Sequence, residues 1–309
     1  MKYLKTYRVF EAFSTPPLTE EQISWLDKCT TGSWKLNSST GLIDVDGDFD
    51  CGSQGLKELK GVKFGKVSRG FNCERNQLTT LEGAPQTVNG GFYCYGNQLT
   101  TLEGAPQTVK GDFYCYENQL TTLVGAPQTV GGGFNCERNQ LTTLEGAPQT
   151  VKWGFNCERN QLTTLEGAPQ TVGGDFYCER NQLTTLEGAP QTVNGFYCDG
   201  NQLTTLEGAP QTVNGVFSCG QNQLTTLEGA PQTVKGFYCD GNPVSEETLK
   251  SIFRLMKNGK SYQQALEEYW PKMGNEDRAL MYKDHSSLTP EETRKYKALA
   301  TYGNIKGYL

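Results

Sequence analysis

The sequence predicts a β-rich solenoid, in which one short unit is copied about ten times, with helical segments at both ends. Two observations support this prediction. The phrase NQLTTLEGAPQTV recurs almost letter for letter, and each copy follows a Phe-x-Cys step. The cysteines of these steps stand 20 to 22 residues apart, which is too short for helix-pair repeats or propeller blades. Such a period fits a coil with one short strand and one return path per turn.

The repeats divide the chain into three parts. Residues 1–45 form an N-terminal leader, helix and cap, residues 46–243 form the solenoid, and residues 244–309 form a C-terminal helical cap or tail. In the first part, Thr19 and Gln22 have the spacing of a capping box, which predicts a helix that covers the first turn. Caps are needed because the open end of a strand ladder can pair with another molecule.

Further elements are expected on both flanks of the repeats. An irregular strand pair should lie around residues 34–36 and 43–45. Helices should begin near Ser245, Ser261 and Thr289, because each of these residues can cap the helical pattern that follows it. The aromatic residues of these helices are expected to form the core of the C-terminal cap.

Within a repeat, strand alternation separates a buried face from an exposed one. It sends Phe71 and Cys73 inward and Asn72 and Glu74 outward. One coil alone buries too few apolar side chains to offset the entropy cost of ordering its residues. The coils must therefore stack, cover each other's apolar faces and share one parallel strand ladder.

The unit also resembles the leucine-rich repeat, L-x-L-x-x-N-x-L-x-x-L. Phe71 and Cys73 stand at the inward strand positions, Asn76 at the asparagine-ladder position, and Leu78 and Leu81 at the next two leucines. The Pro-containing return resembles the short repeats of bacterial leucine-rich-repeat effectors. The resemblance covers about two thirds of the chain and implies a leucine-rich-repeat-like solenoid, but Cys and Gly at usually aliphatic positions leave its curvature open. Asparagines equivalent to Asn76, expected to bond backbone groups of adjacent turns, are Asn97, Asn118, Asn139, Asn160, Asn181, Asn201, Asn222 and Asn242.

The eleven cysteines raise the question of disulfides or metal. Ten recur once per turn without a C-x-x-C pair, and His285 is the single histidine. A column of thiols that point the same way cannot surround one ion tetrahedrally, so we expect buried free thiols that act as small hydrophobes. Redox pairing between adjacent turns and metal binding are the alternatives. No metal site and no cofactor are predicted.

Composition limits the compartment and the partner. The net charge of −6 argues against a partner bound through its nucleic-acid backbone. No apolar run is long enough to span a bilayer, so no membrane partner is expected, and MKYLKTYRVFEAF lacks a secretory core. We expect a cytoplasmic protein. No nucleophile elbow, phosphate loop, dinucleotide fingerprint or metal-ligand spacing occurs, so the sequence does not predict an enzyme.

The copies differ mainly where side chains point away from the core. Outward positions of the strand carry Tyr, Glu, Asp, Asn and Arg, and Tyr and Arg are favoured at protein-binding hot spots. The first patch is the cluster Tyr93, Tyr95, Tyr114 and Tyr116, for which cross-strand aromatic packing without a ligand is the alternative. The predicted partner-binding residues are Tyr93, Tyr95, Tyr114, Tyr116, Glu137, Arg138, Glu158, Arg159, Tyr177, Glu179, Arg180, Tyr197, Asp199 and Tyr238.

Three functional hypotheses follow. The first is a non-enzymatic protein-binding scaffold that engages a host or viral protein through the strand face. It is proposed as phage-encoded because near-identical short repeats behind a Lys-rich N-terminus resemble uncharacterised repeat proteins of large tailed bacteriophages. The second is an internal head protein of a virion. The third is an acidic decoy that imitates nucleic acid and so occupies a host defence enzyme. Its acidic surface would be a column of glutamates that is broken only by Val124.

The virion hypothesis predicts a cleavage site. Residues 5–12 resemble the leader that directs internal proteins into the heads of large tailed phages, where it is cut after a glutamate, here Glu11. Peptide mass mapping of the mature protein should then find Ala12 as the first residue. An intact Met1 in purified virions or in infected cells would argue against this processing.

Overall fold

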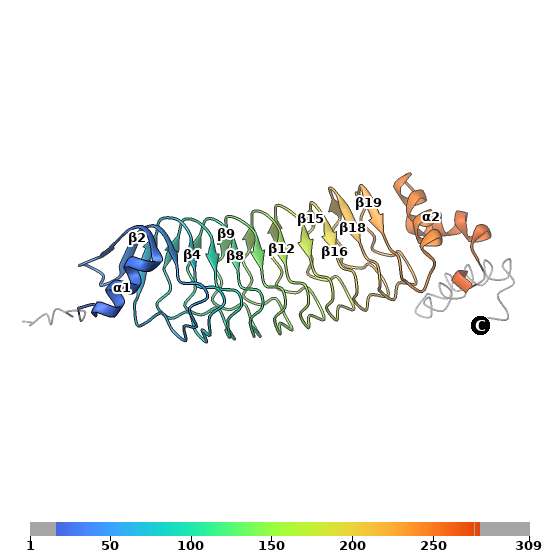
Figure 1. Cartoon of the computed structure of the whole chain (residues 1–309). Helices are drawn as coiled ribbons and strands as arrows, with labels where there is room; N and C mark the ends of the chain where they lie inside the picture. The colour runs from blue at the N-terminus through green and yellow to red at the C-terminus, as the bar shows by residue number, and fades with distance from the viewer. Residues whose placement is uncertain (1–16, 275, 279–309) are drawn as a thin grey trace, which may run out of the picture.

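The computed structural model describes residues 17–274 and 276–278, and it forms an elongated rod of stacked coils with helices at both ends (Figure 1). Ten Phe-x-Cys rungs follow one another along the rod, so nine complete coils lie between the first and the last. The predicted fold class, a leucine-rich-repeat-like solenoid with helical caps, is confirmed. The predicted Thr289 helix lies outside the described residues.

One parallel ladder is built from the Phe strands. They pair in register, so that Phe134 lies between Phe113 and Phe155 of the neighbouring coils. The rings stack, with centroids 5.2 Å apart for Phe113 and Phe134 and 5.5 Å apart for Phe134 and Phe155. The strands of this Phe ladder are β2 (Ile43–Asp50), β4 (Phe71–Asn72), β6 (Phe92–Tyr93), β8 (Phe113–Tyr114), β10 (Phe134–Asn135), β12 (Phe155–Asn156), β14 (Phe176–Tyr177), β16 (Phe196–Tyr197), β18 (Val216–Ser218) and β19 (Gly236–Tyr238).

Each turn also contributes a second short strand, which the sequence analysis did not assign. Thr pairs with Thr and Val with Val, as in Thr150↔Thr171 and Val151↔Val172. A glycine bend separates the two strands of a coil; at Gly90, a Cβ would stand 2.8 Å from the Arg69 carbonyl carbon. The strands of this Thr-Val ladder are β3 (Phe64–Val67), β5 (Thr87–Val88), β7 (Thr108–Val109), β9 (Thr129–Val130), β11 (Thr150–Val151), β13 (Thr171–Val172), β15 (Thr192–Val193) and β17 (Thr212–Val213).

The core is one continuous column of the same side chains. In one coil, Phe71, Cys73, Leu78, Leu81 and Val88 are all fully buried. Their equivalents along the rod are buried as well, so the inward assignment of the Phe and Cys rungs is confirmed. Apolar burial is shared between coils rather than completed within one.

The asparagines form the predicted ladder inside the rod. Asn118 donates from Nδ2 to the carbonyls of Cys94 and Cys115, both at 3.0 Å, and its Oδ1 accepts from the Leu99 amide at 3.1 Å. Since Cys94 and Leu99 belong to the preceding coil, one buried amide satisfies backbone groups of two coils at once. The pattern repeats from Asn76 to Asn242.

The cysteines are free thiols packed in the core, as predicted. Several donate a weak hydrogen bond to the next coil, as Cys136 Sγ does to the Asn156 carbonyl at 3.3 Å. Burial raises the pKa of the Cys136 thiol well above its usual range, which keeps it protonated. Cys29, which lies outside the ladder, ends the N-terminal helix.

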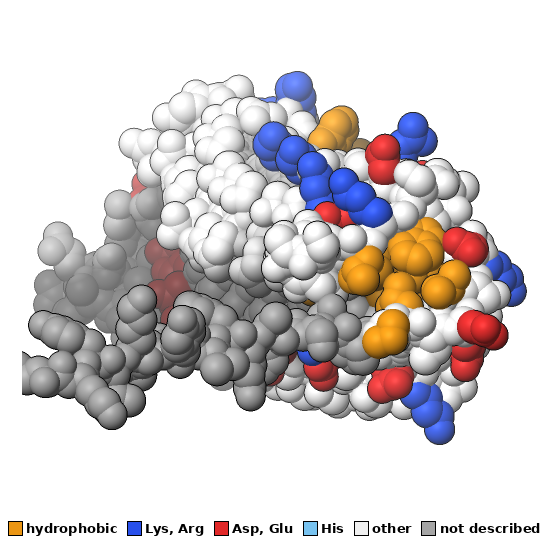
Figure 2. Space-filling model, turned by 90° about the vertical axis from the view of Figure 1, so that its left-hand side faces the viewer, with side chains coloured by type: hydrophobic (Ala, Val, Ile, Leu, Met, Phe, Trp, Pro, Cys, Tyr) orange, Lys and Arg blue, Asp and Glu red, His pale blue; other side chains and the backbone are white. Residues whose placement is uncertain are grey.

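The N-terminal cap covers the first rung. Helix α1 (Glu20–Cys29) begins at the predicted capping box, in which Thr19 and Gln22 bond each other's backbone amides. Its Trp25 packs edge-on against Phe49, with ring centroids 5.1 Å apart. Strand β1 (Thr30–Leu36) runs antiparallel to β2, so the predicted strand pair is present and longer than expected. Apolar side chains gather on this end of the rod (Figure 2), where Leu36 is 42% exposed.

The C-terminal cap closes the other end. It contains α2 (Glu246–Lys257), α3 (Tyr262–Tyr269) and the short 3-10 helix η1 (Trp270–Lys272). Phe253 of α2 stacks on Phe237 of the last rung, with centroids 4.1 Å apart. The Asp277 carboxylate accepts hydrogen bonds from the hydroxyls of Ser245 and Thr248, both at 2.6 Å, and so ties the start of α2 to the following segment.

The asparagine ladder generates a stability prediction. Asn139→Ala removes the bonds to the Cys115 and Cys136 carbonyls and to the Leu120 amide, and leaves these buried groups without a partner. We expect the free energy of unfolding in urea to fall by about 2–4 kcal/mol. The exposed neighbour Gln140→Ala is the control, with an expected change within about 0.5 kcal/mol. Equal changes for both variants would contradict the role of the ladder.

Candidate partner-binding surface

The strand face consists of the outward side chains of the Phe ladder: the residue after each Phe and the two residues after each Cys. Alternation places Tyr93 outward between the buried Phe92 and Cys94. The predicted partner-binding residues therefore lie on one side of the rod, in three parallel columns. Most of them are half-buried against their neighbours along the rod.

The predicted tyrosine patch is a contiguous aromatic cluster. Tyr95 and Tyr116 stack with ring centroids 4.2 Å apart and an interplanar angle of 10°. Tyr93 and Tyr114 lie 5.5 Å apart, and Tyr114 and Tyr116 lie 6.3 Å apart. The Arg75 guanidinium lies 5.9 Å from the Tyr95 ring. The cross-strand packing named as the alternative is thus present, and it holds the rings in contact with one another.

A second tyrosine pair lies further along the rod. Tyr177 and Tyr197 stack with centroids 4.9 Å apart, and the Tyr177 hydroxyl donates to Asp175 at 3.0 Å. Burial, together with this hydrogen bond, raises the pKa of Tyr177 to about 12. Tyr238, at the end of the ladder, is 51% exposed, and the Lys250 ammonium of α2 lies 5.9 Å from its ring. Tyr238 therefore belongs to the junction with the C-terminal cap.

The charged part of the face begins with an ion-pair network. Arg138 contacts Glu117 at 2.8 Å and Glu137 at 3.3 Å, and Arg159 lies 3.7 Å from Glu137. These pairs link three consecutive coils at the surface. Exposed pairs of this kind are individually worth about 1 kcal/mol or less, so they organise the face more than they stabilise the rod.

Further along, carboxylates outnumber their partners. Glu158, Glu179 and Asp199 follow one another in the same column. Burial and the neighbouring carboxylates raise the pKa of Glu179 to about 8, and burial also raises the pKa of Glu158 and of Asp199. The buried Oε2 of Glu179 has no hydrogen-bond partner within the part of the chain that the structure describes. Burial and neighbouring carboxylates therefore disfavour the charged form of these side chains, while Asp199 accepts hydrogen bonds from the Ser218 hydroxyl and the Gly220 amide.

The third column has an unusual backbone. Arg138, Arg159 and Arg180 have φ of 53°, 52° and 53°, in the left-handed region that favours glycine. Other coils place Gly96 and Gly200 at the same position, with φ of 66° and 68°. A side chain at such a position costs about 1 kcal/mol relative to glycine. Glu117 and Gln221 occupy this position in two further coils, with φ of 52° and 51°, so the column carries charged or polar side chains at a local conformational cost.

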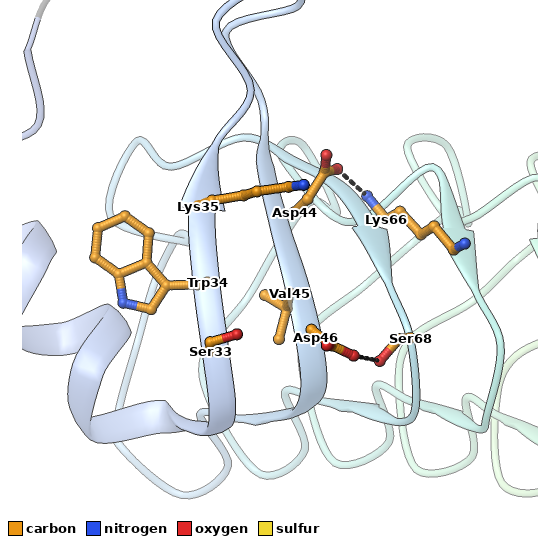
Figure 3. A pocket seen from close by; sticks show the side chains of 8 residues that line it. All are labelled: Ser33, Trp34, Lys35, Asp44, Val45, Asp46, Lys66 and Ser68. Carbon is orange, nitrogen blue, oxygen red and sulfur yellow. Dashed lines mark hydrogen bonds between the residues drawn. The ribbon is translucent and has the colours of Figure 1, made fainter.

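The cavity shown in Figure 3 lies on β1, β2 and β3 beside the N-terminal cap and measures about 340 Å³. The two carboxylates that line it already accept hydrogen bonds from neighbouring residues. Asp44 accepts from the Lys66 amide at 3.0 Å, and Asp46 accepts from the Ser68 hydroxyl at 2.9 Å. We therefore assign this cavity to the start of the Thr-Val ladder, where β2 pairs with β3.

The described residues contain neither a group of metal-binding side chains nor a membrane-spanning helix. Over residues 17–274 and 276–278, no three His, Cys, Asp or Glu side chains are grouped so that they could hold a metal ion. His285 lies outside these residues. None of the described helices has the length and apolar character required to cross a bilayer.

Sequence analysis missed one prominent side chain. Trp153 is 69% exposed, more than any other large hydrophobic residue described. Backbone pairing places it in a row with Gly132 and Gly174, at a position where most coils have glycine or asparagine. The signal was available, because Trp153 is the one tryptophan among the repeats. The strand positions and the glutamate column do not reveal it, because it lies at the bend between the two strands of its coil.

Comparison with known proteins yields fold neighbours alone. No family model and no curated protein matches the chain. YopM, a leucine-rich effector protein from Yersinia pestis, superposes with a TM-score of 0.48 and 21% identity over 63% of this chain and 55% of that chain, about half its length. YopM from Yersinia enterocolitica WA-314 superposes with a TM-score of 0.31 and 15% identity over 74% of this chain and 70% of that chain.

The class of the protein is defined by its own coil. Each turn combines an inward Phe-x-Cys strand, a buried asparagine that bridges to the preceding turn, and two buried leucines on the return. The chain is a leucine-rich-repeat-like solenoid protein, with thiols and phenyl rings where aliphatic side chains are usual.

The crowded carboxylates generate a pH prediction. Because the pKa of Glu179 rises from its ordinary 4.5 to about 8 on folding, the folded state binds more protons than the unfolded state between these values. At low pH the Glu179 carboxyl is protonated in both states and does not oppose folding. As the pH rises through about 8 it must ionise in the folded state, and this stability is lost. Between pH 5 and pH 9, the free energy of unfolding of Glu179→Gln should rise by about 1 kcal/mol relative to that of the wild type. This figure is reduced for solvent screening. Urea unfolding at several pH values measures this difference, and parallel curves would contradict it.

The left-handed column generates a second prediction. Arg180→Gly should raise the free energy of unfolding by up to about 1 kcal/mol, because glycine removes the cost of the positive φ. Arg180→Ala is the matched control, since it removes the same charge but keeps the cost. Thermal unfolding compares the two variants. If glycine is no more stable than alanine at this position, the backbone of the column is not strained.

Proposed function

We propose that the chain is a non-enzymatic scaffold that binds a protein partner along its strand face. The observation that carries this proposal is the third column, where arginines occupy left-handed positions that glycine would fill at lower cost. Stability of the coil does not require these side chains, because glycine coils stand in the same rod. Within the rod, Arg138 and Arg159 pair with Glu117 and Glu137, and their guanidinium groups stay at the surface, where a partner would contact them.

The chemistry of the face suits a protein partner. The stacked tyrosines present rigid amphipathic rings that lose little entropy on binding, and arginine offers a planar set of donors. The core positions are nearly identical in every coil, so the outward positions can vary without altering the fold. A rod of this kind displays a long, preorganised surface, which lowers the entropy cost of association.

The partner should carry positive charge opposite the acidic column. Glu158, Glu179 and Asp199 follow one another in one column, and burial raises the pKa of each despite Arg159 and Arg180 nearby. A Lys or Arg of the partner would relieve this repulsion and lower the raised pKa values. In the setting suggested by the repeat resemblance, the partner is a host or viral protein in the bacterial cytoplasm, and the protein is phage-encoded.

Affinity capture from source or infected cells, followed by mass spectrometry, identifies the partner on which the binding test is run. Alanine at Tyr93, Tyr95, Tyr114 and Tyr116 should weaken pull-down by about tenfold or more, as should Lys at Glu137, Glu158 and Glu179. Glu145→Lys and Glu166→Lys are the charge controls, because these exposed glutamates lie outside the strand face.

The outcomes separate the hypotheses. Unchanged binding in both series would refute the strand face as the interface. Loss that occurs equally with the control lysines, together with steep salt sensitivity, would favour the acidic decoy, because charge alone would then direct association.

A further inference from the structure

The coil around residue 131 departs from the others at several positions. Val124 replaces the glutamate that the flanking coils have at Glu103 and Glu145, and residues 131–133 are all glycine. Trp153 occurs in the next coil. In a rod of near-identical coils, such clustering of exceptions marks a local specialisation.

A notch of about 420 Å³ lies at this place. Lys110 and Lys152 line it from the two flanking coils, and Gly131 stands between them without a side chain. A Cβ at Gly131 would lie 2.1 Å from the Lys110 carbonyl oxygen, so the gap is enforced by the close approach of the two strands. Strand spacing places the two lysine backbones about 9.6 Å apart, within joint reach of one small ligand.

The notch offers hydrogen-bond donors and positive charge without a carboxylate in its lining. Gln107 and Gln128 supply amides, and Thr108 and Thr129 supply hydroxyls. All four side chains are exposed. Neither lysine forms an ion pair with another described residue. The list of lining residues is Gln107, Thr108, Val109, Lys110, Gln128, Thr129, Gly131 and Lys152.

The acids closest in sequence do not compete for the lysines. Asp112 turns its carboxylate to the Gly133 amide, which donates at 2.7 Å. At Val124 the glutamate of this coil is absent. Trp153 follows Lys152 in the chain and is 69% exposed, so its indole ring is open to solvent.

We propose that the notch between Lys110 and Lys152, with the adjacent Trp153, is a binding site for an anionic saccharide. The lysines would hold its sulfate, phosphate or carboxylate group, the amides and hydroxyls would bond its sugar hydroxyls, and the indole would stack on the apolar face of the ring. This site lies on the Thr-Val ladder and does not depend on the strand face.

The test uses the full chain and a fully sulfated heparin-derived disaccharide, with the desulfated disaccharide and inorganic sulfate as comparison ligands, in isothermal titration calorimetry. The sulfated disaccharide should bind about fivefold or more tightly than either comparison ligand. The double variant Lys110→Gln/Lys152→Gln should weaken its binding about tenfold or more, and Trp153→Ala at least about threefold. Lys235→Gln, the control, removes an exposed lysine that follows a ladder valine as these two do, and should change binding less than about twofold.

Three results would overturn the proposal: inorganic sulfate that binds as tightly as the disaccharide, a double variant that binds normally, or an equal loss with Lys235→Gln. If Trp153→Ala binds the disaccharide as tightly as the unaltered protein, the indole does not contact the sugar ring, and the proposed site is wrong in that part. A second measurement needs no variant. The sulfated disaccharide should protect Lys110 and Lys152 of the unaltered protein from amine acylation, as read by mass spectrometry, and leave Lys235 reactive; uniform acylation would count against the site.

Discussion

The buried asparagine of each coil is the interaction on which the structure depends. A side-chain amide in an apolar core is costly unless its groups are bonded, and here every amide is matched to backbone groups of two neighbouring coils. The same bonds satisfy carbonyls and amides that the short, two-residue strands leave open. The buried asparagine and backbone groups are therefore hydrogen-bonded only when the coils stack correctly, and a single coil cannot form these bonds.

This arrangement separates the inside of the rod from its surface. Phe rings, thiols, leucines and asparagines repeat without change because each must fit the coil before and after it. Outward side chains are not constrained in this way, because the backbone hydrogen bonds of the ladder form with any residue at these positions. Arg138 and Gly96 take similar backbone angles at equivalent places. The difference between them therefore lies in the side chain, which in Arg138 pairs with Glu117 and Glu137 at the surface.

Stacking also explains the electrostatics of the strand face. Identical or similar residues recur about 4.8 Å apart along each column, so aromatic rings gain contacts and like charges repel. The tyrosine pairs use this spacing favourably. In Glu158, Glu179 and Asp199 the same spacing crowds carboxylates, and proton uptake relieves the repulsion in the unbound state.

The amino-acid sequence by itself determined the coil, its period, its buried residues and the capping box at Thr19, because these follow from periodicity and local hydrogen bonding that each copy restates. It also placed the strand-face residues on one side, since alternation in a strand needs no tertiary information. The tertiary structure decided what depends on distances between coils. The second strand of each turn appears because Thr and Val pair across coils, the raised pKa of Glu179 arises from burial and neighbours in other coils, and the notch at Gly131 exists because lysines from two flanking coils border a glycine. A single copy of the repeat contains none of these relations, so sequence reasoning within one copy could not reach them.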